Sequence, residues 1–163
     1  MDTKDLYEKE DANGESVYYT DEDCTMPYTG HVEEYFKGKL SWESDIVDGV
    51  GDGIEKSYYD VTGELEIAIE VKYNMANGLG FEYYKSGKIR SIGTWINNLG
   101  IDCYSYDEEG NQEKIELMEE SNFHYILVKD KIPALREKYN LEKLNEEILK
   151  YGKPIKYGKP IYP

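Results

Sequence analysis

The chain has 163 residues, of which 39% are hydrophobic and 13% aromatic, and its formal net charge is −15. This composition excludes a wholly disordered chain and allows one domain with its own core. The negative charge disfavours binding to nucleic acid and to anionic membrane surfaces. The sequence contains neither an apolar run that could span a bilayer nor a signal-peptide pattern, so we expect a cytoplasmic protein.

Residues 1–14 are polar and acidic, and we expect this segment to be flexible. The charge of the whole chain is unevenly distributed: the first 70 residues contain 20 acidic residues and 5 lysines, and they hold all of the excess negative charge. Such an end attracts a basic partner through long-range electrostatics. The alternative is that the acidic residues only keep the protein soluble.

Residues 15–129 contain a degenerate repeat in which a glycine precedes a strand-like run with paired aromatic residues. The copies begin at Gly30, Gly53, Gly80 and Gly100. The aromatic pairs are Tyr35-Phe36, Tyr58-Tyr59 and Tyr83-Tyr84, with Tyr104 and Tyr106 in the weaker fourth copy. A spacing of 20 to 27 residues is typical of repeat proteins, in which stacked units bury a core that one unit cannot bury alone.

Within the repeats, alternating apolar and polar residues predict antiparallel strands joined by glycine-containing turns. The face expected to be buried carries Leu40, Trp42, Ile46, Leu65, Ile67, Ile69, Val71, Tyr73, Ile89 and Trp95. The face expected to point outward carries Glu43, Asp45, Glu66, Glu70, Arg90 and Thr94. The sequence therefore predicts a mainly β fold, an antiparallel meander over residues 15–129 that forms an elongated twisted sheet.

The last two strands of the meander are expected at residues 113–118 and 123–129. A helical segment is expected at residues 130–151, with Pro133 in its first turn and a break near Asn140. Leu135 and Tyr139 lie off the apolar stripe of Leu141, Leu144, Ile148 and Tyr151, which is the reason for the break. We expect this segment to cap the open end of the sheet, and the Pro- and Gly-rich tail at 152–163 to be extended.

No pattern in the chain indicates catalysis. His31 and His124 lack metal-ligand spacing, and Asp45, Asp48 and Asp52 do not fit a calcium-loop spacing. No nucleophile or phosphate-loop motif is present. We therefore expect a protein without enzymatic activity, cofactor or metal. Cys24 and Cys103 lie in the first and last repeat-like units, too far apart for a disulfide, and are expected to be free thiols.

The Gly and Tyr-aromatic units, joined by Asn-Gly or Asp-Gly links, resemble MORN-type repeats, specifically the variant found in bacterial antitoxins of toxin–antitoxin pairs. The likeness covers about residues 14–112. It implies an elongated β-sheet and a protein that binds and neutralises a toxin, with no catalytic residue to carry over. The alternative function is a non-enzymatic repeat scaffold for protein assembly.

On this interpretation the partner is a protein toxin with a basic surface, and the free chain is a monomer. Outward acidic side chains would contact the partner, and an aromatic ring would anchor it. The candidate partner-binding residues are Glu33, Glu43, Asp45, Glu55, Glu66, Glu70 and Tyr59.

Overall fold

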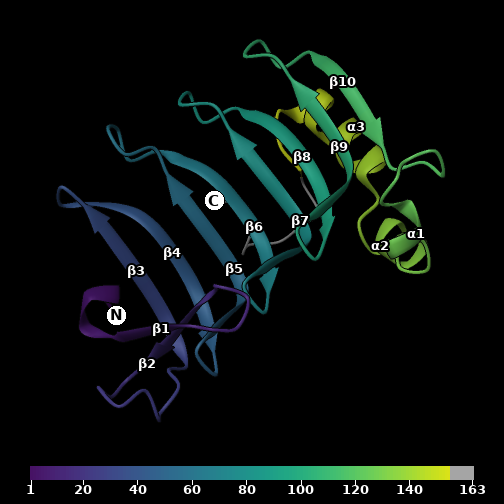
Figure 1. Ribbon diagram of the computed structural model, residues 1–163. Coiled ribbons are helices and arrows are strands. Elements are labelled where there is room, and N and C mark those ends of the chain that lie inside the picture. Colours follow the sequence, from purple (N-terminus) through teal and green to yellow (C-terminus); the bar gives the residue numbers. More distant parts are fainter. Residues whose placement is uncertain (155–163) are drawn as a thin grey trace.

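The computed structural model describes residues 1–154, and its largest element is an open antiparallel sheet of eight strands in meander order (Figure 1). The predicted mainly β fold is thus confirmed. The strands are β3 (Gly30–Phe36), β4 (Lys39–Val47), β5 (Val50–Tyr58), β6 (Leu65–Lys72), β7 (Met75–Tyr83), β8 (Ile89–Ile96), β9 (Leu99–Tyr106) and β10 (Gln112–Leu117).

Tight turns at one end of the sheet place two consecutive residues at positive φ, as two-residue hairpin turns require. These pairs are Asp48-Gly49, Tyr73-Asn74 and Asn97-Asn98. The asparagines also join neighbouring units: Asn74 Oδ1 accepts from the Gly51 N–H at 2.5 Å, and Asn98 Oδ1 accepts from the Ala76 N–H at 2.6 Å. The same turn residue therefore recurs with the same bond in successive repeats.

The repeating glycine of the third unit is Gly78, not Gly80 as the sequence suggested. Gly30, Gly53 and Gly78 have φ values of 153°, 151° and 141°, a region that side chains rarely adopt. A Cβ at Gly78 would lie 2.8 Å from the Cβ of Glu70. Position 80 requires glycine for a steric reason and not because of its φ: a Cβ there would lie 2.8 Å from the ring of Trp95.

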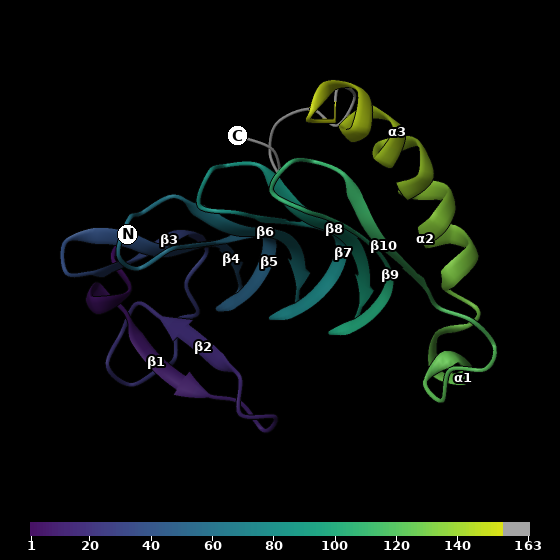
Figure 2. The same cartoon turned by 90° about the horizontal axis from the view of Figure 1, so that it is seen from above.

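The N-terminal segment, expected to be flexible over residues 1–14, contains secondary structure. A 3-10 turn (Thr3–Asp5) precedes β1 (Tyr7–Glu10), which pairs with β2 (Ser16–Tyr19) in a separate two-stranded sheet. Asp2 forms an isolated parallel bridge with Glu33 at the edge of the main sheet. The β1–β2 hairpin lies on one side of the sheet and the helices on the other (Figure 2).

Three helices follow the sheet: α1 (Tyr125–Val128), α2 (Ile132–Lys138) and α3 (Leu141–Tyr151). The prediction of a strand at residues 123–129 is wrong, because Val128 and Ile132 pack as successive helical turns into a second apolar cluster with Ile96. The predicted break is confirmed: Asn140 is the N-cap of α3, and its side chain accepts from the Lys143 N–H at 3.0 Å. No helix within residues 1–154 is long and apolar enough to cross a membrane.

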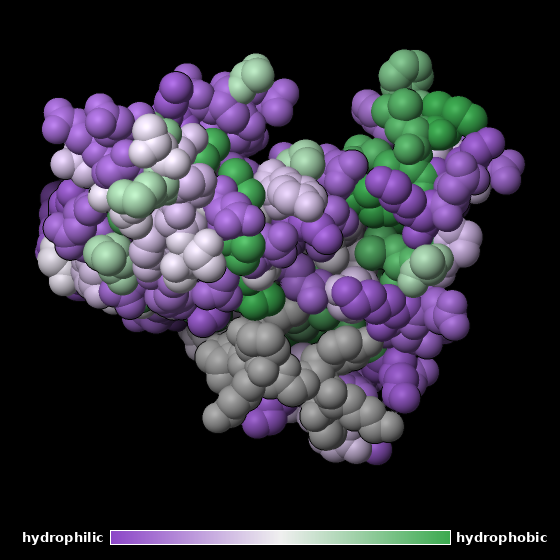
Figure 3. All heavy atoms as spheres, turned by 90° about the horizontal axis from the view of Figure 1, so that it is seen from below, coloured by the Kyte–Doolittle hydropathy of each residue, from purple (hydrophilic) through white to green (hydrophobic). Residues whose placement is uncertain are grey.

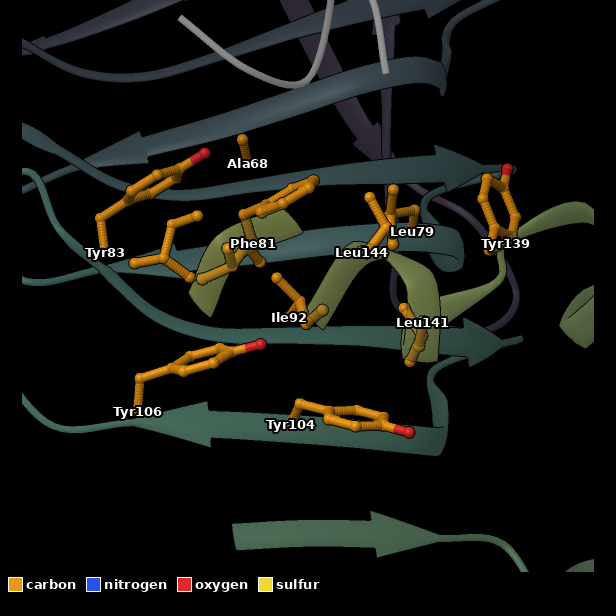
Figure 4. Close-up of a cluster of buried hydrophobic side chains, with 12 residues drawn as sticks. Ala68, Leu79, Phe81, Tyr83, Ile92, Tyr104, Tyr106, Tyr139, Leu141 and Leu144 are labelled. Carbon is orange, nitrogen blue, oxygen red and sulfur yellow. The ribbon is translucent and has the colours of Figure 1, made fainter. Parts of the chain in front are cut away.

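The main core lies between α3 and one face of the sheet, which we call the helix face (Figure 4). The helices cover this face over β7–β9 instead of capping the sheet end, and β10 stays exposed along its length. The buried residues are Ala68, Leu79, Phe81, Tyr83, Ile89, Ile92, Tyr104, Tyr106, Tyr139, Leu141, Leu144 and Ile148. Tyr139 thus joins the same core as the α3 stripe, and Tyr151 is exposed.

The prediction of which face of β6 contributes to the main core is wrong. Ala68 is fully buried on the helix face, whereas Ile67 and Ile69 are only partly buried on the opposite face, called here the hairpin face because β1–β2 lies on it. Val71 is buried, and Tyr73 is 62% exposed. Alternation places side chains on two faces but does not show which face the helices will cover.

The same correction applies in neighbouring strands. Trp42 lies in one cross-strand row with Ile67, and the ring of Trp95 lies against Gly80 and Gly93, all on the hairpin face. Thr94, expected to point outward, is 1% exposed. Cys24 and Cys103 are free, as predicted. Of the predicted extended tail, residues 155–163 lie outside the described residues.

Candidate protein-docking site

One cross-strand row on the helix face changes from charged to apolar along the sheet. On β3, β4 and β5 it consists of Glu33, Glu43 and Lys56. It continues through Ala68, Phe81, Ile92, Tyr104 and Ile115. The helices cover the apolar part, and no described helix covers the charged part (Figure 2). The side chains of His31 and Asp45 on these strands are 44% and 51% exposed, whereas that of Glu43 is 13% exposed. His31 and Asp45 are therefore more accessible to a partner than Glu43.

His31 is at the centre of this surface. Its Nδ1 lies 2.9 Å from Asp45 Oδ1, and its Nε2 lies 3.0 Å from Glu43 Oε2. Hydrogen bonds to Asp45 and Glu43 outweigh partial burial and raise the pKa of His31. Both ring nitrogens face carboxylates, so the arrangement favours the imidazolium, which donates from both nitrogens. We refer to His31, Glu33, Glu43 and Asp45 as the acidic cluster.

Glu43 is held in place by a second pair of donors. Lys56 Nζ donates to Glu43 Oε1 at 3.0 Å, and the Tyr58 hydroxyl donates to the same oxygen at 2.6 Å. Burial acts to raise the pKa of Glu43, but the bonds from Tyr58 and Lys56 outweigh it and the pKa is lowered. Glu43 therefore stays ionised in a fixed orientation.

The acidic cluster also has metal-ligand groups: single ligand atoms of His31, Glu33 and Glu43 lie within 4.8 Å of one another. Both His31 nitrogens are already bonded to carboxylates, and Lys56 adds a positive charge beside Glu43. These contacts favour an ion-pair network over a metal centre, because a bound cation would displace the imidazole proton and be repelled by the lysine.

The structure brings together only three of the candidate partner-binding residues: Glu33, Glu43 and Asp45. Glu70, expected to face outward, is used inside the fold. Its Oε2 accepts from the Leu79 N–H at 2.7 Å and from the Tyr139 hydroxyl. Its carboxylate thus links β6, β7 and the junction of α2 and α3.

Tyr59 is also used within the fold. Its hydroxyl donates to the Tyr83 carbonyl at 2.6 Å, and Tyr84 makes the equivalent bond to the Tyr106 carbonyl at 2.7 Å. These bonds join the same position of successive units. Glu66 lies close enough to Tyr59 for its charge to help raise the pKa of the Tyr59 hydroxyl, after the larger effect of burial.

Glu55 lies on the hairpin face, in a row with Ser44 and Ile69, and so is separated from the acidic cluster by the sheet. Sequence reasoning missed His31, whose partners are 12 and 14 residues away and become neighbours only through the β3–β4 register. One sequence pattern could have indicated the cluster: in a hairpin, the alternate residues His31 and Glu33 lie opposite the alternate residues Glu43 and Asp45.

Hydropathy separates the two ends of the molecule. Seen from below, the end with the N-terminal units is mainly hydrophilic, and the largest group of hydrophobic residues lies at the other end (Figure 3). Phe123, Ile126 and Leu127, in and just before α1, are exposed hydrophobic residues of the C-terminal part of the chain. A comparison with protein-family models gives no match for this chain, and a comparison with curated proteins gives none either.

Proposed function

We propose that this chain is a cytoplasmic antitoxin or immunity protein that binds a basic protein toxin and covers its active site. The observation that carries the proposal is the acidic cluster on the part of the helix face that the helices leave uncovered. The resemblance of the repeats to those of bacterial antitoxins supports the choice of a toxin as partner. Acidic surfaces speed the association of basic partners and select against acidic ones.

The chemistry of the acidic cluster suits binding better than catalysis. Its carboxylates already have donors: His31 bonds Asp45 and Glu43, Lys56 and Tyr58 bond Glu43, and Tyr35 bonds Glu33. They therefore present a rigid, net negative surface. Such preorganisation reduces the entropy that is lost when a partner docks.

The test is co-purification of the chain with its partner from cells that express it, followed by expression of the partner in a sensitive host. We expect the partner to be basic and toxic, and co-expression of the chain to restore growth. A non-toxic partner that assembles with the chain would contradict the antitoxin function and favour a scaffold.

A matched pair of variants tests the site. The triple variant Glu33→Gln, Glu43→Gln and Asp45→Asn removes three charges while keeping the hydrogen-bond acceptors. The control Glu109→Gln, Glu119→Gln and Glu120→Gln removes the same charge from exposed sites elsewhere. We expect only the first variant to lose protection. Equal protection by both would show that the acidic cluster is not the docking site.

A further inference from the structure

A cavity of about 250 Å³ lies between the β1–β2 hairpin and the hairpin face of the sheet. The hairpin and the loop before β2 contribute Tyr18 and Glu15 to its walls, and the sheet contributes Trp42 and Glu55. Pockets for drug-sized ligands are larger, about 300 to 1,000 Å³. The volume is therefore suited to one side chain of a partner.

The walls of this cavity are negatively charged. Burial raises the pKa of the Glu55 carboxyl; a hydrogen bond from Trp42 opposes the rise, and the charge of Glu15 adds to it. Burial, together with the charges of surrounding glutamates, raises the pKa of Tyr18 to about 12. Burial disfavours any charge, but the part of each shift that comes from neighbouring glutamates shows a negative electrostatic environment, which favours a positive charge over a further negative one.

The described chain supplies no such positive charge. No lysine, arginine or histidine is among the residues of 1–154 that line the cavity. Neither Glu15 nor Glu55 takes part in an ion pair within the same residues. A half-buried carboxylate without a counter-ion is costly, so the site gains most from a cation that arrives from outside.

The aromatic wall selects among cations. An indole ring attracts a cation over its face more strongly than other aromatic rings, and a guanidinium also stacks flat against it. The five donors of a guanidinium can serve two carboxylates at once, whereas an ammonium is a single point charge. We propose that this cavity binds an arginine side chain of a protein partner, between Glu15 and Glu55 and against Trp42.

Other occupants fit less well. An apolar side chain would bury Glu55 further without compensating its charge, and an acidic side chain would be repelled. The cavity and the acidic cluster lie on opposite faces of the sheet. Binding at the cavity therefore does not depend on the proposed docking site. A negative result for one of these two proposals does not contradict the other.

The test uses Nα-acetyl-arginine amide as the probe and Nα-acetyl-citrulline amide as its neutral isostere. The chain has two tryptophans, so their indole N–H signals in proton–nitrogen NMR spectra serve as reporter and internal control. We expect the arginine probe to shift the Trp42 signal with saturation at about millimolar concentration, as befits one side chain. Trp95, which lines a separate cavity, should not shift in parallel.

Citrulline amide should leave Trp42 unshifted, and Nα-acetyl-lysine amide should bind at least about threefold more weakly, because it lacks the planar fork. Glu55→Gln should weaken the arginine probe at least about fivefold, because one of the two carboxylates is lost. Glu116→Gln, beside Trp95, is the matched control and should bind as the unmodified chain does.

Three results would overturn the proposal: equal binding of citrulline amide, equal binding of lysine amide, or unchanged affinity in Glu55→Gln. Thermal melting of each variant checks that it is folded. If Glu55→Gln does not fold, Glu15→Gln takes its place in the same titration, because Glu15 lines the cavity from the loop before β2.

Discussion

Glu43 and Phe81 lie in the same cross-strand row and on the same face of the sheet, connected through Lys56 and Ala68. Phe81 is 1% exposed in the core beneath α3, whereas Glu43 bonds His31 at the uncovered end. The side chains of this row change from charged to apolar where the helices begin to cover the sheet. The apolar core therefore lies at the helix-covered end of this face, and the proposed docking site lies at its uncovered end.

The position of the core is tested by two isoleucines on opposite faces. Ile92→Ala removes a side chain that is fully buried beneath the helices and should cost about 2 to 5 kcal/mol. Ile67→Ala, on the partly exposed hairpin face, should cost less than half as much. Urea unfolding of both variants measures the difference. Equal losses would contradict the assignment of the core to the helix face.

His31 makes stability depend on pH. Its pKa is raised in the folded state by Asp45 and Glu43, so its stabilising contribution is complete below the unfolded value of about 6.5. The contribution is lost as the pH rises through the folded value. We expect the free energy of unfolding to fall over this window and His31→Gln to remove that fall.

His124→Gln is the control for this experiment, because His124 is the other histidine of the chain and lies before α1. It should keep the pH dependence. A profile that is unchanged in His31→Gln would show that the acidic cluster is not coupled to folding.

The local parts of the fold could be predicted from the sequence. Alternation and turn glycines predict the meander, and the cap at Asn140 divides the helical segment, because these signals act over a few residues. The segment at 123–129 is apolar enough for a strand, but its packing against Ile96 makes part of it helical. The buried face and the His31 contacts depend on distant partners, which a local pattern does not contain.

Tyr59 tests whether the hydroxyl bonds between units stabilise the sheet. Tyr59→Phe removes the bond to the Tyr83 carbonyl and should cost about 0.5 to 1.5 kcal/mol. Tyr73→Phe is the control, because Tyr73 lies in an exposed turn and should change stability by less than about 0.5 kcal/mol. Urea unfolding compares them. An equal effect of the two would rule out a structural role for the Tyr59 hydroxyl.

Glu55 should reduce stability at neutral pH. Its folded-state pKa is raised, so the folded state takes up protons more readily than the unfolded state, and stability decreases as the pH rises through the raised value. Glu55→Gln should therefore raise the melting temperature at pH 7, and the advantage should shrink below about pH 4, where the unfolded carboxyl is also protonated. A lower melting temperature at pH 7 would contradict the assigned charge state of Glu55.

The central claim is that the acidic cluster binds a basic partner, and the rate of association at two ionic strengths tests it most directly. The variant Glu33→Gln, Glu43→Gln and Asp45→Asn should associate about tenfold more slowly than the unmodified chain at low salt, with a flatter salt dependence. The control Glu109→Gln, Glu119→Gln and Glu120→Gln has the same net charge as the acidic-cluster variant. It should keep most of the association rate of the unmodified chain. Equal rates and equal salt dependence for the two variants would contradict the claim, because net charge alone would then explain the association.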